Sequence, residues 1–128
     1  MKINDYFTGL QHVGIPSENL DKTIAFYEKI GFEKAGQFMN GENRVAFMRY
    51  GNLTVETWEG DPVNKEDGAI NHLSMNTTDV DAAFKAAKEM GLEVIDSEIQ
   101  ELPFWDNGIR FFNIYGPNHE KLEFCQIV

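Results

Sequence analysis

Two histidines and two glutamates at related positions of the 128-residue sequence could together hold a divalent metal ion. His12 and His72 each begin a short apolar stretch, HVGI and HLSM, whereas Glu56 and Glu123 each interrupt one, in LTVETW and EKLEFCQ. Imidazole nitrogen and carboxylate oxygen suit Zn²⁺ and Ni²⁺ first, and Co²⁺, Mn²⁺ or Fe²⁺ as well. The set lacks thiolate, which argues against a closed structural zinc site. An octahedral ion with four protein ligands would keep two positions for water or substrate, as a catalytic metal requires.

An ordinary structural explanation competes with this one. A single histidine on a strand is more often a structural or surface residue than a ligand. The two glutamates need a partner because they lie in half-buried strands, and that partner could instead be an arginine in an ion pair. Of the other candidates, His119 in the turn GPNHEK is expected to be exposed, and Cys125 is expected to be a small core residue whose inward direction leaves a minor role open. The arginines available for such ion pairs are Arg44, Arg49 and Arg110.

An internal repeat relates the four residues. HVGIPSENLDKTIAFYEKIGFEK, from His12, aligns without a gap with HLSMNTTDVDAAFKAAKEMGLEV, from His72, at a shift of 72 − 12 = 60 residues. Both copies predict a strand, a polar turn and an amphipathic helix that ends at a glycine. Ser17 or Asn19 is expected to cap the first helix, and Thr78 or Asp79 the second. The identities across the repeat are His12 with His72, Asp21 with Asp81, Gly31 with Gly91 and Glu33 with Glu93.

The second part of each copy is rich in β-forming residues. RVAFMRY and NLTVETW follow the first helix, and IRFFNIY and EKLEFCQIV follow the second. Each half therefore predicts a βαβββ module. The predicted fold class is α+β, with two such modules in one chain forming curved mixed sheets that carry the helices on their outer faces. We place the first module at about residues 8–59, the linker at about 60–68 and the second module at about 69–128 of a single domain.

The alternation of side chains along a strand assigns these residues to one face of each sheet. Val13 and Ile15 are expected to face the helix, so that His12 points to the concave side. The same alternation directs His72, Glu56 and Glu123 inward. Each module thus contributes a histidine from its first strand and a glutamate from its last strand to a common cavity.

Composition narrows the possible partners. The formal charge is 11 − 21 = −10 and the basic residues are scattered, which argues against nucleic acid and anionic membranes. One cysteine cannot form an internal disulfide, and no apolar stretch approaches the roughly 20 residues that cross a bilayer. The N-terminal sequence MKINDYFTGL lacks the core of a signal peptide. We expect a soluble cytoplasmic protein that acts on a small molecule.

These residues resemble the vicinal oxygen chelate superfamily, which includes glyoxalase I, fosfomycin resistance proteins, methylmalonyl-CoA epimerase, extradiol dioxygenases and bleomycin resistance proteins. The resemblance covers nearly the whole chain. It rests on QHVGIPSENLDKTIAFYEKIGF, TVETWE, INHLSMNTTDVDAAFKAAKEMG and YGPNHEKLEF. Many members use two histidines and one glutamate, matching His12, His72 and Glu123, and bacterial glyoxalase I adds a second glutamate at the position of Glu56.

The resemblance implies a metal-dependent isomerase or lyase of the glyoxalase I (lactoylglutathione lyase) type. Its substrate would be a thiol hemithioacetal or a related 2-oxo or 2-hydroxy compound, converted by proton transfer through an enediolate. Glu123 would be a metal ligand and the principal base, and Glu56 would return the proton. It also implies a homodimer with sites at the interface, where His12 and Glu56 could face His72 and Glu123 of the partner chain.

The resemblance leaves the substrate open. Bacterial glyoxalase I usually has arginine and asparagine at the positions of Pro16 and Gly60, where they help to hold glutathione. The alternatives are another metalloenzyme of the superfamily, namely an extradiol dioxygenase, an epimerase or a fosfomycin-type thiol transferase, or a non-catalytic small-molecule-binding resistance protein. The segment LPFWDNGIR could be a pocket wall, or a surface loop and the start of a core strand. The predicted substrate-binding residues are Trp58, Phe104, Trp105 and Arg110.

Overall fold

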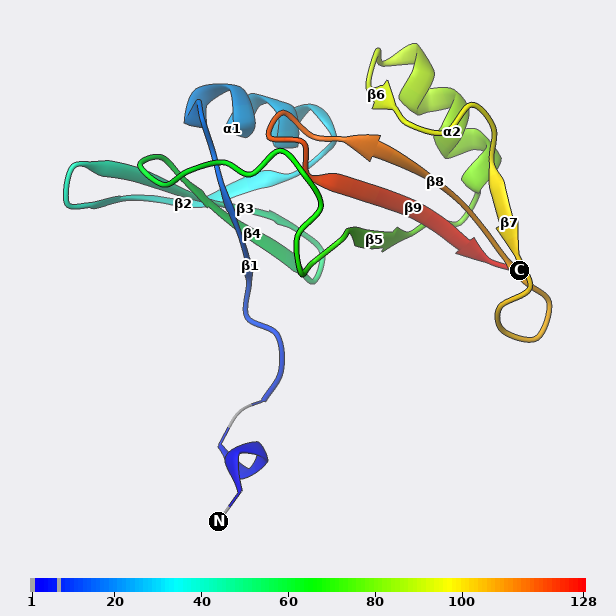
Figure 1. Ribbon diagram of the computed structural model, residues 1–128, viewed down its shortest axis with the longest axis horizontal. Coiled ribbons are helices and arrows are strands. Elements are labelled where there is room, and N and C mark those ends of the chain that lie inside the picture. Colours follow the sequence, from blue (N-terminus) through cyan, green and yellow to red (C-terminus); the bar gives the residue numbers. More distant parts are fainter. Residues whose placement is uncertain (1, 7) are drawn as a thin grey trace. The chain divides into compact units, whose positions relative to one another are not determined.

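The computed structural model describes residues 2–6 and 8–128, and the chain divides into two compact units, Met1–Val63 and Asn64–Val128. Within each unit, one α-helix lies against one face of a sheet (Figure 1). This arrangement confirms the predicted α+β fold class, in which each half combines a helix with a sheet.

The first unit builds a four-stranded sheet in the order β1-β4-β3-β2. β1 runs parallel to β4, and the other neighbours are antiparallel. The buried face of this sheet packs on α1 through Ala46, Met48 and Val55, which have no exposed surface. The elements are the 3-10 helix η1 (Ile3–Asp5), β1 (Val13–Pro16), α1 (Leu20–Lys29), β2 (Glu33–Asn40), β3 (Asn43–Tyr50) and β4 (Leu53–Trp58).

The second unit repeats this plan with one additional strand. Its sheet has the order β5-β9-β8-β6, with β7 also paired to β8, and β5 runs parallel to β9. Phe112 lies at the centre of its core, where it packs between Phe84 of the helix and Phe124 of β9 at ring distances of 5.1 and 5.3 Å. The elements are β5 (Leu73–Asn76), α2 (Val80–Glu89), β6 (Glu93–Val94), β7 (Gln100–Leu102), β8 (Ile109–Tyr115) and β9 (Lys121–Ile127).

The extra strand arises because the edge of the second sheet is interrupted. In the first unit β2 pairs with β3 along its length and has a bulge between Lys34 and Gly36. In the second unit, the segment between β6 and β7 leaves the edge of β8. Asp96 in this segment accepts a hydrogen bond from the backbone N–H of Asn113 at 2.6 Å. The Asp96 carboxylate thus accepts the hydrogen bond that a backbone carbonyl of a continuous edge strand would otherwise accept.

The helix boundaries follow local capping. Asn19 accepts a hydrogen bond from Lys22 N–H, and Asp79 accepts one from Ala82 N–H, which selects these two residues over Ser17 and Thr78 as the caps. At the other ends, Gly31 and Gly91 have φ angles of 107° and 72°, a region that favours glycine after a helix. In the part of the chain described, no helix combines the length and apolar character needed to cross a membrane.

Candidate metal centre

In the first unit, the pairing of β1 with β4 brings His12 to Glu56. Gly14 lies beside Glu56 in the register, so that His12, two residues earlier, projects from the same face. The distance from His12 Nε2 to Glu56 Oε1 is 3.6 Å. Phe47, opposite Glu56 on β3, meets the edge of the His12 ring at a centroid distance of 5.7 Å. Histidine and glutamate therefore form a half-exposed pair on the face away from α1.

In the second unit, β5 and β9 produce the same juxtaposition. Ser74 lies beside Glu123 in the register, and His72 precedes it by two residues. His72 Nε2 is 3.8 Å from Glu123 Oε2, and 14% of the Glu123 side chain is exposed, against 29% for Glu56. The sheet pairing thus brings together the His and Glu predicted for each half.

Both histidines are oriented by the residue that precedes them. His12 Nδ1 contacts the amide oxygen of Gln11, and His72 Nδ1 lies 2.8 Å from Asn71 Oδ1. An amide oxygen can only accept, so this contact favours the hydrogen on Nδ1, and the neutral ring that has it there carries its lone pair on Nε2. A ring nitrogen opposite a hydrogen-bonded N–H is the usual metal-binding atom of histidine. In both units this atom is the one that faces the glutamate.

The arginines that could have neutralised the two glutamates are bound elsewhere. Arg44 contacts Asp21 at 2.9 Å and Glu59 at 3.0 Å, and Arg110 contacts Asp81 at 2.7 Å and Glu101 at 3.2 Å. Arg49 donates to the hydroxyl of Thr54. Within residues 2–6 and 8–128, therefore, neither Glu56 nor Glu123 has an arginine partner, and the ion-pair explanation has no support.

These ion pairs shift the pKa values of their members. The pKa of Arg44 is raised, chiefly by its hydrogen bond to Glu59 and then by the one to Asp21. The pKa of Glu59 is lowered by Arg44 and by the backbone N–H of Leu20, and that of Asp81 is lowered by Arg110. Both arginines therefore stay cationic, and each fastens the first turn of its helix to the sheet.

The donor atoms of each pair are compatible with a metal ion. Two ligands about 2.1 Å from one ion lie about 3.0 Å apart when adjacent in an octahedron and about 3.4 Å apart in a tetrahedron. The observed separations of 3.6 and 3.8 Å are slightly wider and need only a small side-chain movement. Among the residues described, no group of three or more His, Cys, Asp or Glu side chains is placed to hold an ion. Each unit by itself thus provides two of the four predicted ligands.

The predicted substrate-binding residues occupy different places. Trp58 follows Glu56 on the same face of β4, and its indole N–H donates to Asp61 at 2.6 Å. Phe104 and Trp105 lie in the loop between β7 and β8, where their exposed fractions are 53% and 70%. Arg110 is the second residue of β8 and lies beside Gln126, on the side of the sheet where its guanidinium reaches Asp81 of α2. Only Trp58 therefore shares a sheet face with a predicted metal ligand.

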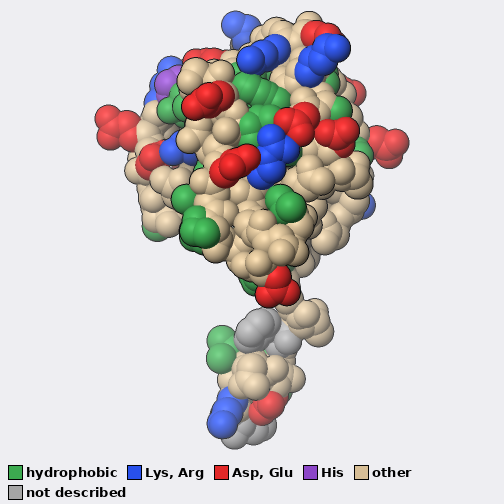
Figure 2. Space-filling model, turned by 90° about the vertical axis from the view of Figure 1, so that its right-hand side faces the viewer, with side chains coloured by type: hydrophobic (Ala, Val, Ile, Leu, Met, Phe, Trp, Pro, Cys, Tyr) green, Lys and Arg blue, Asp and Glu red, His purple; other side chains and the backbone are tan. Residues whose placement is uncertain are grey.

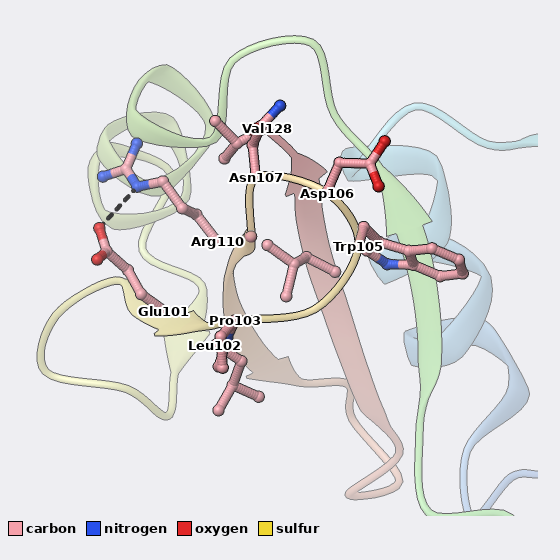
Figure 3. A pocket seen from close by; sticks show the side chains of 10 residues that line it. Glu101, Leu102, Pro103, Trp105, Asp106, Asn107, Arg110 and Val128 are labelled. Carbon is pink, nitrogen blue, oxygen red and sulfur yellow. Dashed lines mark hydrogen bonds and ion pairs between the residues drawn. The ribbon is translucent and has the colours of Figure 1, made fainter.

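The β7–β8 loop encloses a surface hollow of about 660 Å³. In Figure 3, the loop curves around the hollow, Arg110 extends toward Glu101, and the Trp105 ring points away from both. Figure 2 shows acidic and basic side chains intermingled on one face of the molecule, so that this face presents no extended patch of a single charge. The hollow is lined by Glu101, Leu102, Pro103, Trp105, Asp106, Asn107, Gly108, Ile109, Arg110 and Val128.

The structure shows the contacts of His119 and Cys125, the two weaker candidates for the site. His119 is exposed and stacks on Tyr115 with ring centroids 4.6 Å apart, and its Nδ1 lies 3.2 Å from the carbonyl oxygen of Lys65. Cys125 is buried and free, with its sulfur 3.2 Å from the Ser74 hydroxyl. Cys125 is thus a core residue that also borders the surroundings of Glu123.

Three residues next to the ligands were missed in the sequence. Gln11 and Asn71 stand at the same shift of 60 residues as the two histidines, so an extension of the repeat by one position would have found them. Ser74 has no counterpart in the repeat, because Gly14 occupies its place in the first half, but alternation with Leu73 and Met75 predicts that it shares the inward face with His72.

Comparisons with known proteins identify the family to which the chain belongs. Residues 11–112 match the sequence profile of the glyoxalase/bleomycin resistance protein/dioxygenase superfamily. The uncharacterised protein YwbC of Bacillus subtilis is 31% identical over 124 residues, covering 91% of this chain and 96% of YwbC.

Solved structures share the fold at lower identity. A glyoxalase family protein from Enterococcus faecalis has a TM-score of 0.77 at 21% identity, covering 94% of this chain and 98% of its own. The fosfomycin resistance protein FosX from Listeria monocytogenes, complexed with Mn(II) and sulfate, has a TM-score of 0.73 at 20% identity, covering 95% and 94%. The chain belongs to the glyoxalase/bleomycin resistance protein/dioxygenase (vicinal oxygen chelate) superfamily.

Proposed function

We propose that this protein is a divalent-metal-dependent enzyme of the glyoxalase I type, with His12, Glu56, His72 and Glu123 as the ligands. It would convert a thiol hemithioacetal, or a related 2-oxo or 2-hydroxy compound, by moving a proton between adjacent carbons. The proposal places the active protein in the cytoplasm as a homodimer. The observation that carries it is the repeated His–Glu pair, in which Nε2 faces a carboxylate oxygen at 3.6 Å in one unit and 3.8 Å in the other.

The donor set and one protein of the same fold support a divalent first-row metal ion. Two imidazole nitrogens and two carboxylates suit Zn²⁺ or Ni²⁺, and Co²⁺, Mn²⁺ or Fe²⁺ also fit. FosX, which shares the fold, has been seen with Mn(II). A bound ion would stabilise negative charge that develops on the two substrate oxygens.

The protein's own residues would move the proton. Glu123 would accept a proton from the carbon beside the carbonyl, which leaves an enediolate, and Glu56 would return a proton to the neighbouring carbon. Both carboxylates can act as bases because neither is held in an ion pair with an arginine of the described chain. Trp58, on the face of Glu56, would contact the substrate.

The direct test combines metal analysis with a substrate panel. The chelated protein is reloaded separately with Zn²⁺, Ni²⁺, Co²⁺ and Mn²⁺, its bound metal is measured by elemental analysis, and it is assayed with hemithioacetals made from several thiols. We expect stoichiometric metal and turnover with at least one adduct. Glu123→Gln should lower kcat about 100-fold or more, in the range of general-base catalysis. Glu93→Gln, an exposed acid on β6, is the matched control and should keep full activity.

Several results would contradict the proposal. A protein that retains no metal after reloading, or a Glu123→Gln variant with intact turnover, would exclude the proposed chemistry. Oxygen uptake with a catechol, or modification of fosfomycin, would assign the same ligands to another enzyme class of the superfamily. Ligand affinity that survives both chelation and His72→Ala would indicate a binding protein without catalysis.

A further inference from the structure

The two glutamates have different surroundings, although the repeat places them at equivalent positions. Ser74 Oγ donates a hydrogen bond to Glu123 Oε1 at 2.7 Å. The residue equivalent to Ser74 in the first unit is Gly14, which has no side chain and lies beside Glu56 in the same register. Within its own unit, Glu56 therefore lacks the hydroxyl donor that Glu123 has.

The hydrogen bond from Ser74 is the stronger of its two contacts. Its hydroxyl carries one hydrogen and lies 2.7 Å from the Glu123 carboxylate and 3.2 Å from the Cys125 sulfur. A charged carboxylate is a much better acceptor than a thiol sulfur, so the hydrogen points to Glu123. Oε1 of Glu123 is thereby fixed by a hydrogen bond, and Oε2 is the oxygen that faces His72 Nε2.

The first unit cannot hold a serine at the equivalent position without rearrangement. A Cβ added at Gly14 would lie 3.1 Å from the indole ring of Trp58, which is closer than an ordinary carbon contact. Trp58 corresponds in position to Cys125, two residues beyond the glutamate of each unit. The small Cys125 leaves room for Ser74, whereas a side chain at residue 14 would require the Trp58 ring to shift.

We infer that Ser74 is a positioning residue, which fixes the Glu123 carboxylate through Oε1 so that Oε2 alone is presented to the metal, whereas Glu56 is left free to rotate. This inference rests on the proposed function, because it assigns Ser74 a role toward the ion that Glu123 would bind. A partner that orients a ligating carboxylate typically changes metal affinity by about 10–100-fold when it is removed.

The test measures Co²⁺ binding rather than turnover. Co²⁺ affinity is obtained by calorimetric titration, and the visible absorption of the bound ion reports its ligand geometry. Ser74→Ala should weaken Co²⁺ binding about 10–100-fold and change the spectrum. Ser74→Thr keeps the hydroxyl and should restore both. Ser97→Ala removes an exposed hydroxyl elsewhere in the same unit and should match the wild type. Thermal unfolding of each metal-free variant checks that the fold is retained.

The outcomes separate this inference from the proposed function. A wild-type protein that binds no Co²⁺ overturns the proposed function and the inference together. If the wild type binds Co²⁺ and Ser74→Ala has the same affinity and spectrum, only the inference fails. Loss of affinity that Ser74→Thr does not restore would assign Ser74 to packing and also overturn it. If Ser74→Ala does not fold, Ser74→Cys, which keeps the size but donates weakly, decides between the same outcomes.

Discussion

The residues that precede the two histidines contact the imidazole rings of the proposed metal site. Gln11 and Asn71 each offer an amide oxygen to Nδ1 of the following ring. This contact favours the tautomer with the lone pair on Nε2, and it also helps to set the rotation of the ring. Two neighbours in the sequence therefore help to orient the histidines, and Phe47 also packs against the His12 ring.

Replacing the amide should weaken metal binding without disturbing the fold. In Asn71→Leu, the His72 ring loses its Nδ1 partner, and we expect Co²⁺ or Zn²⁺ affinity to fall by about 10-fold or more. Asn71→Asp retains an oxygen acceptor and should stay close to the wild type. Competition with a chromophoric chelator measures both affinities. Equal affinities for the leucine and aspartate variants would show that Asn71 does not orient the ring.

At the level of helices and strands, the two His–Glu pairs have similar positions because each helix is anchored to its sheet in the same way. The free N–H group at the start of α1 donates from Leu20 to Glu59 at 3.0 Å, and that of α2 donates from Val80 to Gln126 at 2.9 Å. Glu59 directly follows β4 and contacts Arg44, and Gln126 is the penultimate residue of β9 and lies beside Arg110. The first unit thus uses a carboxylate where the second uses an amide.

This difference predicts an acid sensitivity that comes from Glu59 and to which the amide of Gln126 cannot contribute. Arg44 lowers the pKa of Glu59 in the folded protein below its ordinary value of 4.5. The unfolded chain therefore binds more protons below that pH, and the stability contributed by Glu59 is complete above pH 4.5 and is lost as the pH falls through the folded pKa. Urea unfolding of the wild type should show this loss between about pH 5 and pH 3.

The matched variant is Glu59→Gln, which reproduces the arrangement of the second unit. It keeps an acceptor for Leu20 N–H but cannot titrate, so that its stability should depend less steeply on pH over the same interval. Wild-type and variant curves of identical slope would show that the Glu59 carboxylate has no role in acid sensitivity.

The sequence predicted the fold class and the local pairing of ligands because both depend on periodic patterns. Alternation along β1 and β4 places His12 with Glu56, and the repeat places His72 with Glu123 in the same way. The split of one edge strand into β6 and β7 could not be predicted, since it depends on the side chain of Asp96 replacing a backbone partner.

The ion pair between Arg110 and Asp81 could not be predicted from the sequence either. Arg110 was predicted to contact substrate, because a cation in an aromatic segment suggests anion binding. The structure shows that its guanidinium meets two carboxylates of its own unit, Asp81 and Glu101. A contact of this kind joins residues 29 positions apart in the sequence and depends on how the helix packs on the sheet.

At the scale of the whole molecule, each of the two units carries one half of the proposed ligand set. The first provides His12 and Glu56, and the second provides His72 and Glu123. In a homodimer, the first unit of each chain could form a site with the second unit of the other chain. Such a dimer would contain two complete sets of four ligands. We therefore expect light scattering to give twice the mass of one chain.

A mixing experiment tests whether ligands are shared between chains. One variant carries His12→Ala with Glu56→Gln, and the other carries His72→Ala with Glu123→Gln. Neither should bind Zn²⁺ tightly alone, whereas a hybrid dimer made by co-expression should regain one intact site per two chains. Isothermal titration of the purified hybrid measures this stoichiometry. A monomer with a complete site, or a hybrid without metal, would rule out the shared arrangement.

The contrast between Gly14 with Trp58 and Ser74 with Cys125 has a consequence for how this protein could have arisen. A tandem gene duplication first produces two identical halves, and therefore two identical carboxylate environments. In the present chain the residues at these two positions are linked sterically, since a Cβ at residue 14 would lie 3.1 Å from the Trp58 indole, which would have to shift. Neither exchange could be reversed alone without a clash or a void, so that the asymmetry, once acquired, would tend to be retained during later evolution.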